Sequence, residues 1–125
     1  QAGEGYWVNT QAPSSVGIPS GTAFNLTTAN LATGWNLAAM GNTVTPSAFN
    51  LSLSATPPTT GTVPLNLTSL WAWDNATQAW YFYAPSLEAQ GGTKLTDYIA
   101  SHGYRDFSAT GKTLGPNVGF WVNKP

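Results

Sequence analysis

The chain has 125 residues, a formal net charge of −1 at pH 7, no cysteine and only 7% charged residues. This length suits one domain, and the 42% hydrophobic share supplies enough apolar surface for a folded core. Four Lys and Arg residues are too few to neutralise the phosphates of an ordinary nucleic-acid footprint, and no apolar run reaches the ~20 residues that cross a bilayer, so we expect neither nucleic-acid binding nor a membrane span.

Two pentapeptides 114 positions apart are almost identical, Gly-Tyr-Trp-Val-Asn at 5–9 and Gly-Phe-Trp-Val-Asn at 119–123. Each follows turn-forming residues and is rich in strand-forming ones, so each predicts a strand. The repetition is typical of a tandem-repeat protein. We therefore interpret 1–125 as a single domain in which 5–9 is a strand resembling the tail of a preceding repeat, 10–21 is a loop or linker, and 22–125 is a complete module.

The next two predicted strands follow the loop. Apolar residues alternate at 22–27 and again at 34–40, which is the period of a half-buried strand. In the second of these, one face carries Trp35, Leu37 and Ala39.

Two short helices are predicted, at about 45–54 and 93–102. Thr45 and Pro46 suit the N-cap and first helical position of the first helix. Thr93 is the expected N-cap of the second helix, and Gly103 suits the left-handed position after its end.

A β-hairpin is predicted from strands at 67–74 and 79–84 around a polar turn. Alternation places Trp71 with Trp73 on one face of their strand, and Tyr81 with Tyr83 on the face opposite Trp80. Together these elements predict a mainly β, β-rich α+β fold: a small antiparallel sheet, or an open barrel or sandwich, with two short helices.

Four segments of the chain resemble a repeat module of bacterial, chiefly proteobacterial, secreted and surface proteins, which runs from a GWNL start to a GFWVN end. The segments are GWNL at 34–37, LWAWD at 70–74, WYFYAP at 80–85 and VGFWVN at 118–123. The resemblance covers 34–123, with 5–9 as the tail of a further module. Because this family has no established catalytic residues, the resemblance implies an extracellular location and a repeat architecture only.

The residues needed for catalysis or metal binding are sparse. The single histidine, His102, falls at the end of a predicted helix, and there is no cysteine to form a nucleophile or a zinc site. The five acids are scattered through predicted loops and helices, and their pattern positions no pair of carboxylates. We therefore predict a protein that is not an enzyme, with no catalytic residue, metal or cofactor.

The aromatic hairpin is the strongest candidate for a binding surface. If one row of its rings is exposed, they suit the apolar C–H faces of sugars, and neighbouring amides and carboxylates suit the hydroxyl groups. The candidate ligand-binding residues are Trp73, Trp80, Tyr81, Tyr83, Asp74, Asn75 and Asn36.

Three interpretations of the hairpin remain open. The first is a secreted or cell-surface module that binds a neutral polysaccharide or a cell-surface glycan. The second is a structural module that packs against neighbouring repeat modules and has no small ligand. In the third, both faces of the hairpin are buried in the core and no binding surface exists.

Overall fold

The computed structural model describes residues 5–15, 17, 24 and 26–125. Its sheet contains β1 (Gly34–Ala39), β2 (Ser69–Asp74), β3 (Ala79–Tyr83), β4 (Arg105–Asp106) and β5 (Gly119–Lys124). Its helices are the 3-10 helix η1 (Thr28–Asn30), α1 (Pro46–Ser52), α2 (Pro85–Glu88), α3 (Lys94–Ser101) and α4 (Phe107–Thr110). No helix among the described residues has the length and apolar character needed to span a membrane.

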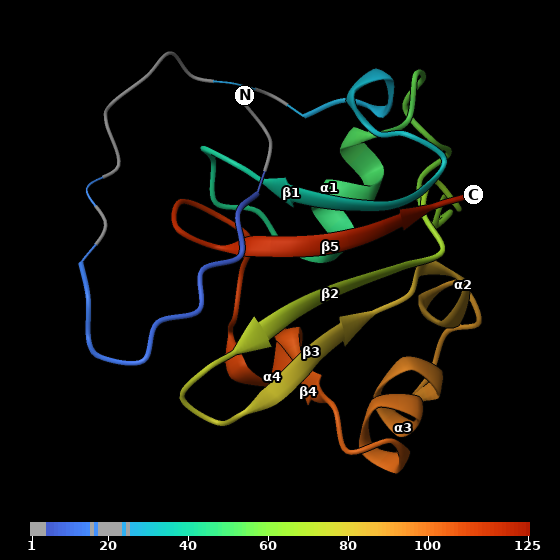
Figure 1. The fold of residues 1–125 in the computed structure, drawn as a ribbon. Coiled ribbons are helices and arrows are strands. Elements are labelled where there is room, and N and C mark those ends of the chain that lie inside the picture. The colour runs from blue at the N-terminus through green and yellow to red at the C-terminus, as the bar shows by residue number, and fades with distance from the viewer. Residues whose placement is uncertain (1–4, 16, 18–23, 25) are drawn as a thin grey trace.

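The five strands form one sheet in the order β1-β5-β2-β3-β4 (Figure 1). Every neighbouring pair is antiparallel except β3 and β4, which are parallel. The C-terminal strand β5 therefore lies inside the sheet, between β1 and β2. The predicted β-rich α+β class is confirmed, and the sheet is open and mixed.

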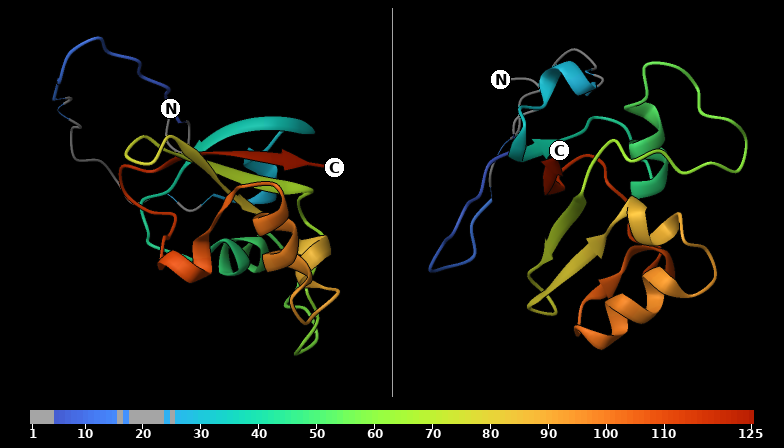
Figure 2. Two further views of the ribbon diagram at one scale, coloured as in Figure 1. Left: turned by 90° about the horizontal axis from the view of Figure 1, so that it is seen from below. Right: turned by 90° about the vertical axis from the view of Figure 1, so that its right-hand side faces the viewer.

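The main core lies between one face of the sheet and the helices α1 and α4, as Figure 2 shows in its left-hand view. Phe120 and Val122 of β5 are fully buried there, and the ring of Phe49 from α1 meets Phe120 edge-on at 5.3 Å. Tyr81 packs against Phe107 of α4 in the same layer. A smaller cluster joins α3 to the β3 edge of the sheet through Ile99.

The two predicted helices form as α1 and α3, and each begins and ends close to the residues that predicted its ends. The Thr45 hydroxyl accepts the Ala48 N–H at 3.1 Å and Pro46 opens α1. Gly103 follows α3 with a φ of +70°, the left-handed conformation that glycine adopts at least cost. Thr93 is the N-cap residue of α3, as predicted, although its hydroxyl donates to the Asp97 carboxylate at 2.8 Å and accepts no backbone N–H.

The leading segment 5–9 does not form the strand that its sequence predicts. Gly5 reaches the sheet edge, where its N–H donates to the Leu37 carbonyl at 3.1 Å, and the chain then crosses in front of β1 and β5 (Figure 1). Tyr6, Trp7 and Val8 remain 75%, 55% and 63% exposed. The equivalent strand position is already occupied by β5, so this second copy of the pentapeptide has no sheet position here.

The region after the leading segment is only partly described. Residues 10–15 are irregular, in keeping with a loop, whereas most of 16–21 lies outside the described residues. Of the strand predicted at 22–27, residues 24, 26 and 27 are described and lie outside any strand, whereas 22, 23 and 25 fall outside the described residues. Leu26, which is described, is buried in the main core without belonging to a strand.

Candidate functional site

All six tryptophans of the chain lie on the sheet face opposite the main core. The strand register produces this arrangement, because residues directly opposite each other on neighbouring strands point to the same face. Trp71 pairs with Trp121, and Trp73 pairs with Trp80. Trp35 shares this face as the register partner of Asn123, two residues after Trp121. The sixth, Trp7 of the leading segment, stacks on Trp80 at 6.1 Å between ring centroids.

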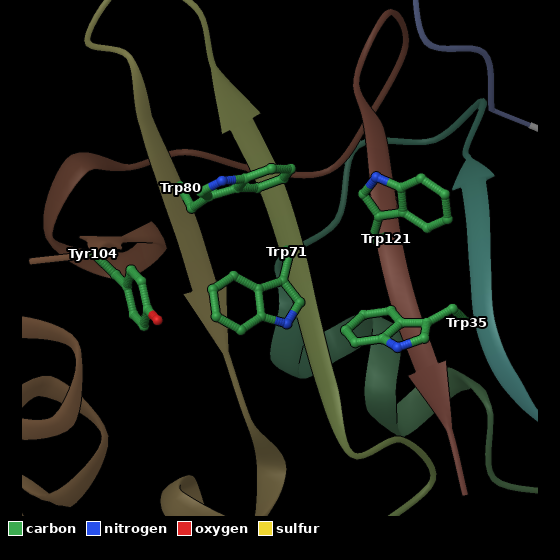
Figure 3. Close-up of a pocket in the computed structure, with 5 residues that line it drawn as sticks. All are labelled: Trp35, Trp71, Trp80, Tyr104 and Trp121. Atoms are coloured by element: carbon green, nitrogen blue, oxygen red, sulfur yellow. The ribbon is translucent and has the colours of Figure 1, made fainter. Parts of the chain in front are cut away.

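Five aromatic residues of this face enclose an open groove of about 640 Å³ (Figure 3). They come from β1, β5, β2, β3 and the position just before β4, in that spatial order: Trp35, Trp121, Trp71, Trp80 and Tyr104. The groove therefore crosses the strands, with one ring for each strand. We call this set the tryptophan groove.

The rings of the tryptophan groove differ in tilt. Figure 3 shows Trp71 and Trp121 with their ring faces turned toward the viewer and Trp80 nearly edge-on. The interplanar angles agree: Trp80 stands at 88° to Trp71, and Tyr104 stands at 80° to it. Trp71 and Trp121 thus form a floor, and the rings of Trp80 and Tyr104 rise beside it.

Neighbouring groups contact the Trp71 ring of the floor and the Trp80 ring, which forms a wall beside it. The Trp71 indole N–H donates to the Ser69 hydroxyl at 3.0 Å, which fixes the ring on its strand. Phe82 packs against the Trp71 ring at 4.6 Å. Trp73 meets Trp80 at 5.1 Å and 61°, so it braces the wall from outside the groove. These contacts position the rings of Trp71 and Trp80 within the groove.

No charged side chain lines the groove among the described residues. Arg105 and Lys112 lie over the Tyr81 ring, which belongs to the opposite face. The Lys124 ammonium donates to the Thr28 and Leu31 carbonyls at 3.1 and 3.0 Å. The groove can therefore offer aromatic faces and indole N–H groups to a ligand, but no opposite charge to an ionised one.

The structure divides the four aromatic residues predicted for the site. Trp80 lines the groove, and Trp73 packs behind it. Tyr81 and Tyr83 are only 5% and 4% exposed, because they point into the main core beneath α1 and α4. They cannot contact a ligand on the tryptophan face, and we remove them from the site.

The three predicted polar residues have local structural partners. The Asp74 carboxylate accepts hydrogen bonds from the Ala76 N–H and the Thr77 hydroxyl, which closes the hairpin turn. The hydrogen bond from the Thr77 hydroxyl is the main cause that lowers the pKa of Asp74, and the backbone N–H groups of the turn lower it further by smaller amounts. The Asn75 side chain accepts a bond from Gln78 within that turn. Asn36 bonds the backbone of Ala32 and Gly34, so it shapes the entry to β1.

Sequence reasoning missed four of the five groove residues: Trp35, Trp71, Trp121 and Tyr104. The alternation of Trp35 and Trp121 with buried neighbours is visible in the sequence, but their strands are far apart in the chain. Tyr104 carries no signal of its own, because it follows Gly103 in what the sequence indicates only as a helix end. Strand pairing, which the sequence does not show, brings these rings together.

A second cavity, of about 330 Å³, contains polar side chains that the sequence analysis left scattered. Glu88 and Asp106 both line it, together with Lys112. Each carboxylate is engaged: Glu88 accepts from the Tyr83 and Ser47 hydroxyls at 2.6 and 3.2 Å, and Asp106 caps α4. Burial, followed by the hydrogen bond to Glu88, raises the pKa of the Tyr83 phenol well above its usual range. Within the described residues, no group of three or more His, Cys, Asp or Glu is placed to hold a metal ion.

Comparisons with protein-family models, with curated proteins and with solved structures find no significant match to this chain. The resemblance to a repeat module of bacterial surface proteins therefore stays a prediction.

Proposed function

We propose that this protein is a non-catalytic, extracellular binding module that binds carbohydrate through the tryptophan groove. The observation that carries the proposal is the gathering of all six tryptophans on one sheet face, with five aromatic rings around one open groove. A monomeric protein rarely leaves large apolar rings in water without a binding role, because burying each one would stabilise the fold.

The chemistry of sugars fits such a surface. The C–H groups on the face of a pyranose ring are apolar and stack on an indole face, while the hydroxyl groups at its rim stay hydrated or accept indole N–H bonds. Trp35 is 57% exposed and Trp121 is half-buried, so each ring leaves part of its surface open to a ligand. The groove requires little rearrangement on binding, which favours affinity.

Native affinity electrophoresis against a panel of soluble polysaccharides tests the proposal. We expect the chain to be retarded by at least one neutral polysaccharide. Trp35→Ala and Trp121→Ala should each weaken retardation about tenfold, a loss of about 1.4 kcal/mol. Leu65→Ala is the matched control, because Leu65 is 60% exposed but does not line the groove. Retardation that is unchanged in both tryptophan variants would contradict the proposal.

The second candidate function is a structural repeat module that packs against neighbouring modules. One observation favours it: the pentapeptide that forms buried β5 at 119–123 recurs at 5–9, where its apolar side chains are exposed. Deleting 1–10 separates the two candidates. If the protein is only a structural module, the intact chain should bind no glycan and the deletion should hardly change the melting temperature. If it is a binding module, the intact chain should bind a glycan, and the deletion should alter the affinity because it removes the Trp7 ring that stacks on Trp80. A large loss of stability would show that 5–9 belongs to this fold.

A further inference from the structure

The floor of the tryptophan groove constrains which carbohydrate can bind. Trp71 and Trp121 are register partners on adjacent strands, so their Cβ atoms are about 5 Å apart. Their ring faces both turn outward (Figure 3). From these neighbouring positions the Trp71 ring extends toward β3 and the Trp121 ring extends toward β1 (Figure 3). The two flat rings are therefore spread across the sheet, and each can stack on the flat face of a different unit of one sugar chain that lies across the strands.

We infer that the ligand is an uncharged, extended chain of pyranose units whose hydroxyl groups are equatorial, as in β-1,4-linked glucose, lying across the strands. This inference rests on the proposed function and specifies its ligand. Equatorial substitution leaves only C–H groups on both faces of each ring. An axial hydroxyl would insert a polar group between sugar and indole, where it would lose water without gaining a partner.

The direction in which the sugar chain lies follows from the order of the aromatic rings across the sheet. From Trp35 on β1 to Tyr104 beside β4 the groove crosses four strand spacings, about 19 Å in all at roughly 4.8 Å each. One strand spacing is close to the length of one pyranose unit in an extended chain. We therefore expect about four consecutive units to contact the groove.

The inference that the ligand is uncharged follows from the residues that line the groove. Among the described residues the lining holds no Lys, Arg, Asp or Glu, and the nearby cations Arg105, Lys112 and Lys124 are directed elsewhere. A carboxylate or sulfate on the glycan would lose hydration over indole faces and find no cation. Binding should accordingly change little between 50 and 500 mM salt, because no ion pair is available to be screened.

Isothermal titration calorimetry on the full chain tests this inference with three tetrasaccharides. These are cellotetraose, β-1,4-linked mannotetraose, which carries an axial hydroxyl on each unit, and tetragalacturonate, which is charged. We expect cellotetraose to bind at least tenfold more tightly than the other two, with affinity that rises from the dimer to the tetramer and then levels off. Trp121→Phe should retain part of the affinity that Trp121→Ala loses.

The outcomes separate the two proposals. Equal or tighter binding of mannotetraose or tetragalacturonate would overturn the inference and leave carbohydrate binding standing. Failure of all three tetrasaccharides and of a wide glycan panel would overturn both. Sedimentation at several protein concentrations supplies a further check, because self-association that buries the tryptophan face would identify a second copy of the chain as the occupant and overturn the inference.

Discussion

Val122 and Val8 occupy equivalent places in the two pentapeptides but very different environments, so one substitution at both positions tests the fold directly. Val122 is fully buried in β5, whereas Val8 is 63% exposed. Val122→Ala removes two buried carbons, worth about 1.6 kcal/mol in transfer free energy. The cavity left behind raises the expected loss of unfolding free energy to about 2–3 kcal/mol.

The same substitution at Val8 should change the unfolding free energy by less than about 0.5 kcal/mol, as for most exposed positions. Urea denaturation followed by circular dichroism measures both losses, provided that the dependence of free energy on urea stays constant across the variants. A domain of this size should also lose roughly 6–12 °C of melting temperature for Val122→Ala.

A loss at Val8 as large as that at Val122 would refute the reasoning, because it would mean that 5–9 is paired in a sheet. A loss below about 1 kcal/mol at Val122 would equally contradict the position of β5 between β1 and β2.

Three further predictions concern local structure. Thr45→Ala should lower the unfolding free energy by about 1 kcal/mol in urea titrations, because it removes the hydroxyl that accepts the Ala48 N–H at the start of α1. Gly111→Ala should lower it by about 1 kcal/mol, since Gly111 ends α4 at a φ of +66° that alanine adopts only with strain; Gly17→Ala, with open space around it, is the control. The pKa of the Tyr83 phenol is raised in the folded state, so its stabilising effect is present below the unfolded pKa of about 10 and is lost as the pH rises above that value. The urea midpoint should therefore fall more steeply between pH 9 and 11 in the wild type than in Tyr83→Phe. Equal slopes would contradict the buried hydrogen bond from Tyr83 to Glu88.

The helices and the hairpin could be predicted because their signals are local. A cap residue followed by proline identified the start of α1, and Gly103 identified the end of α3. The strands β2 and β3 lie within the hairpin ranges that alternation predicts. Each of these elements is specified by residues within a few positions of its own ends.

The shortest helices were missed although end signals are present. Pro85 follows directly after the strand predicted at 79–84 and opens α2, where its missing N–H costs nothing. Asp106 and Gly111 bracket α4 as N-cap and left-handed C-cap. Four residues provide no apolar stripe, so a search based on helical periodicity cannot detect such helices.

The site could be predicted only in part, because it depends on strand pairing over long sequence distances. Alternation correctly separated Trp80 from Tyr81 and Tyr83 on β3. It could not show which of the two faces α1 and α4 would cover, since those helices come from segments on either side of the hairpin. Nor could alternation show that Trp35 and Trp121 lie on strands near that of Trp71, because this depends on the spatial strand order β1-β5-β2 in the sheet.

The one-sided distribution of tryptophan has a spectroscopic consequence. Because every indole of the chain lies on the sheet face away from α1 and α4, its intrinsic fluorescence samples that face and not the Phe49–Phe120 core layer. Energy transfer among rings only 5–6 Å apart should make the emission behave as a collective signal rather than six separate ones. Quenching by acrylamide would then measure solvent access to this single surface, while events confined to α1, α4 and the Phe49–Phe120 core layer would pass without a change in emission.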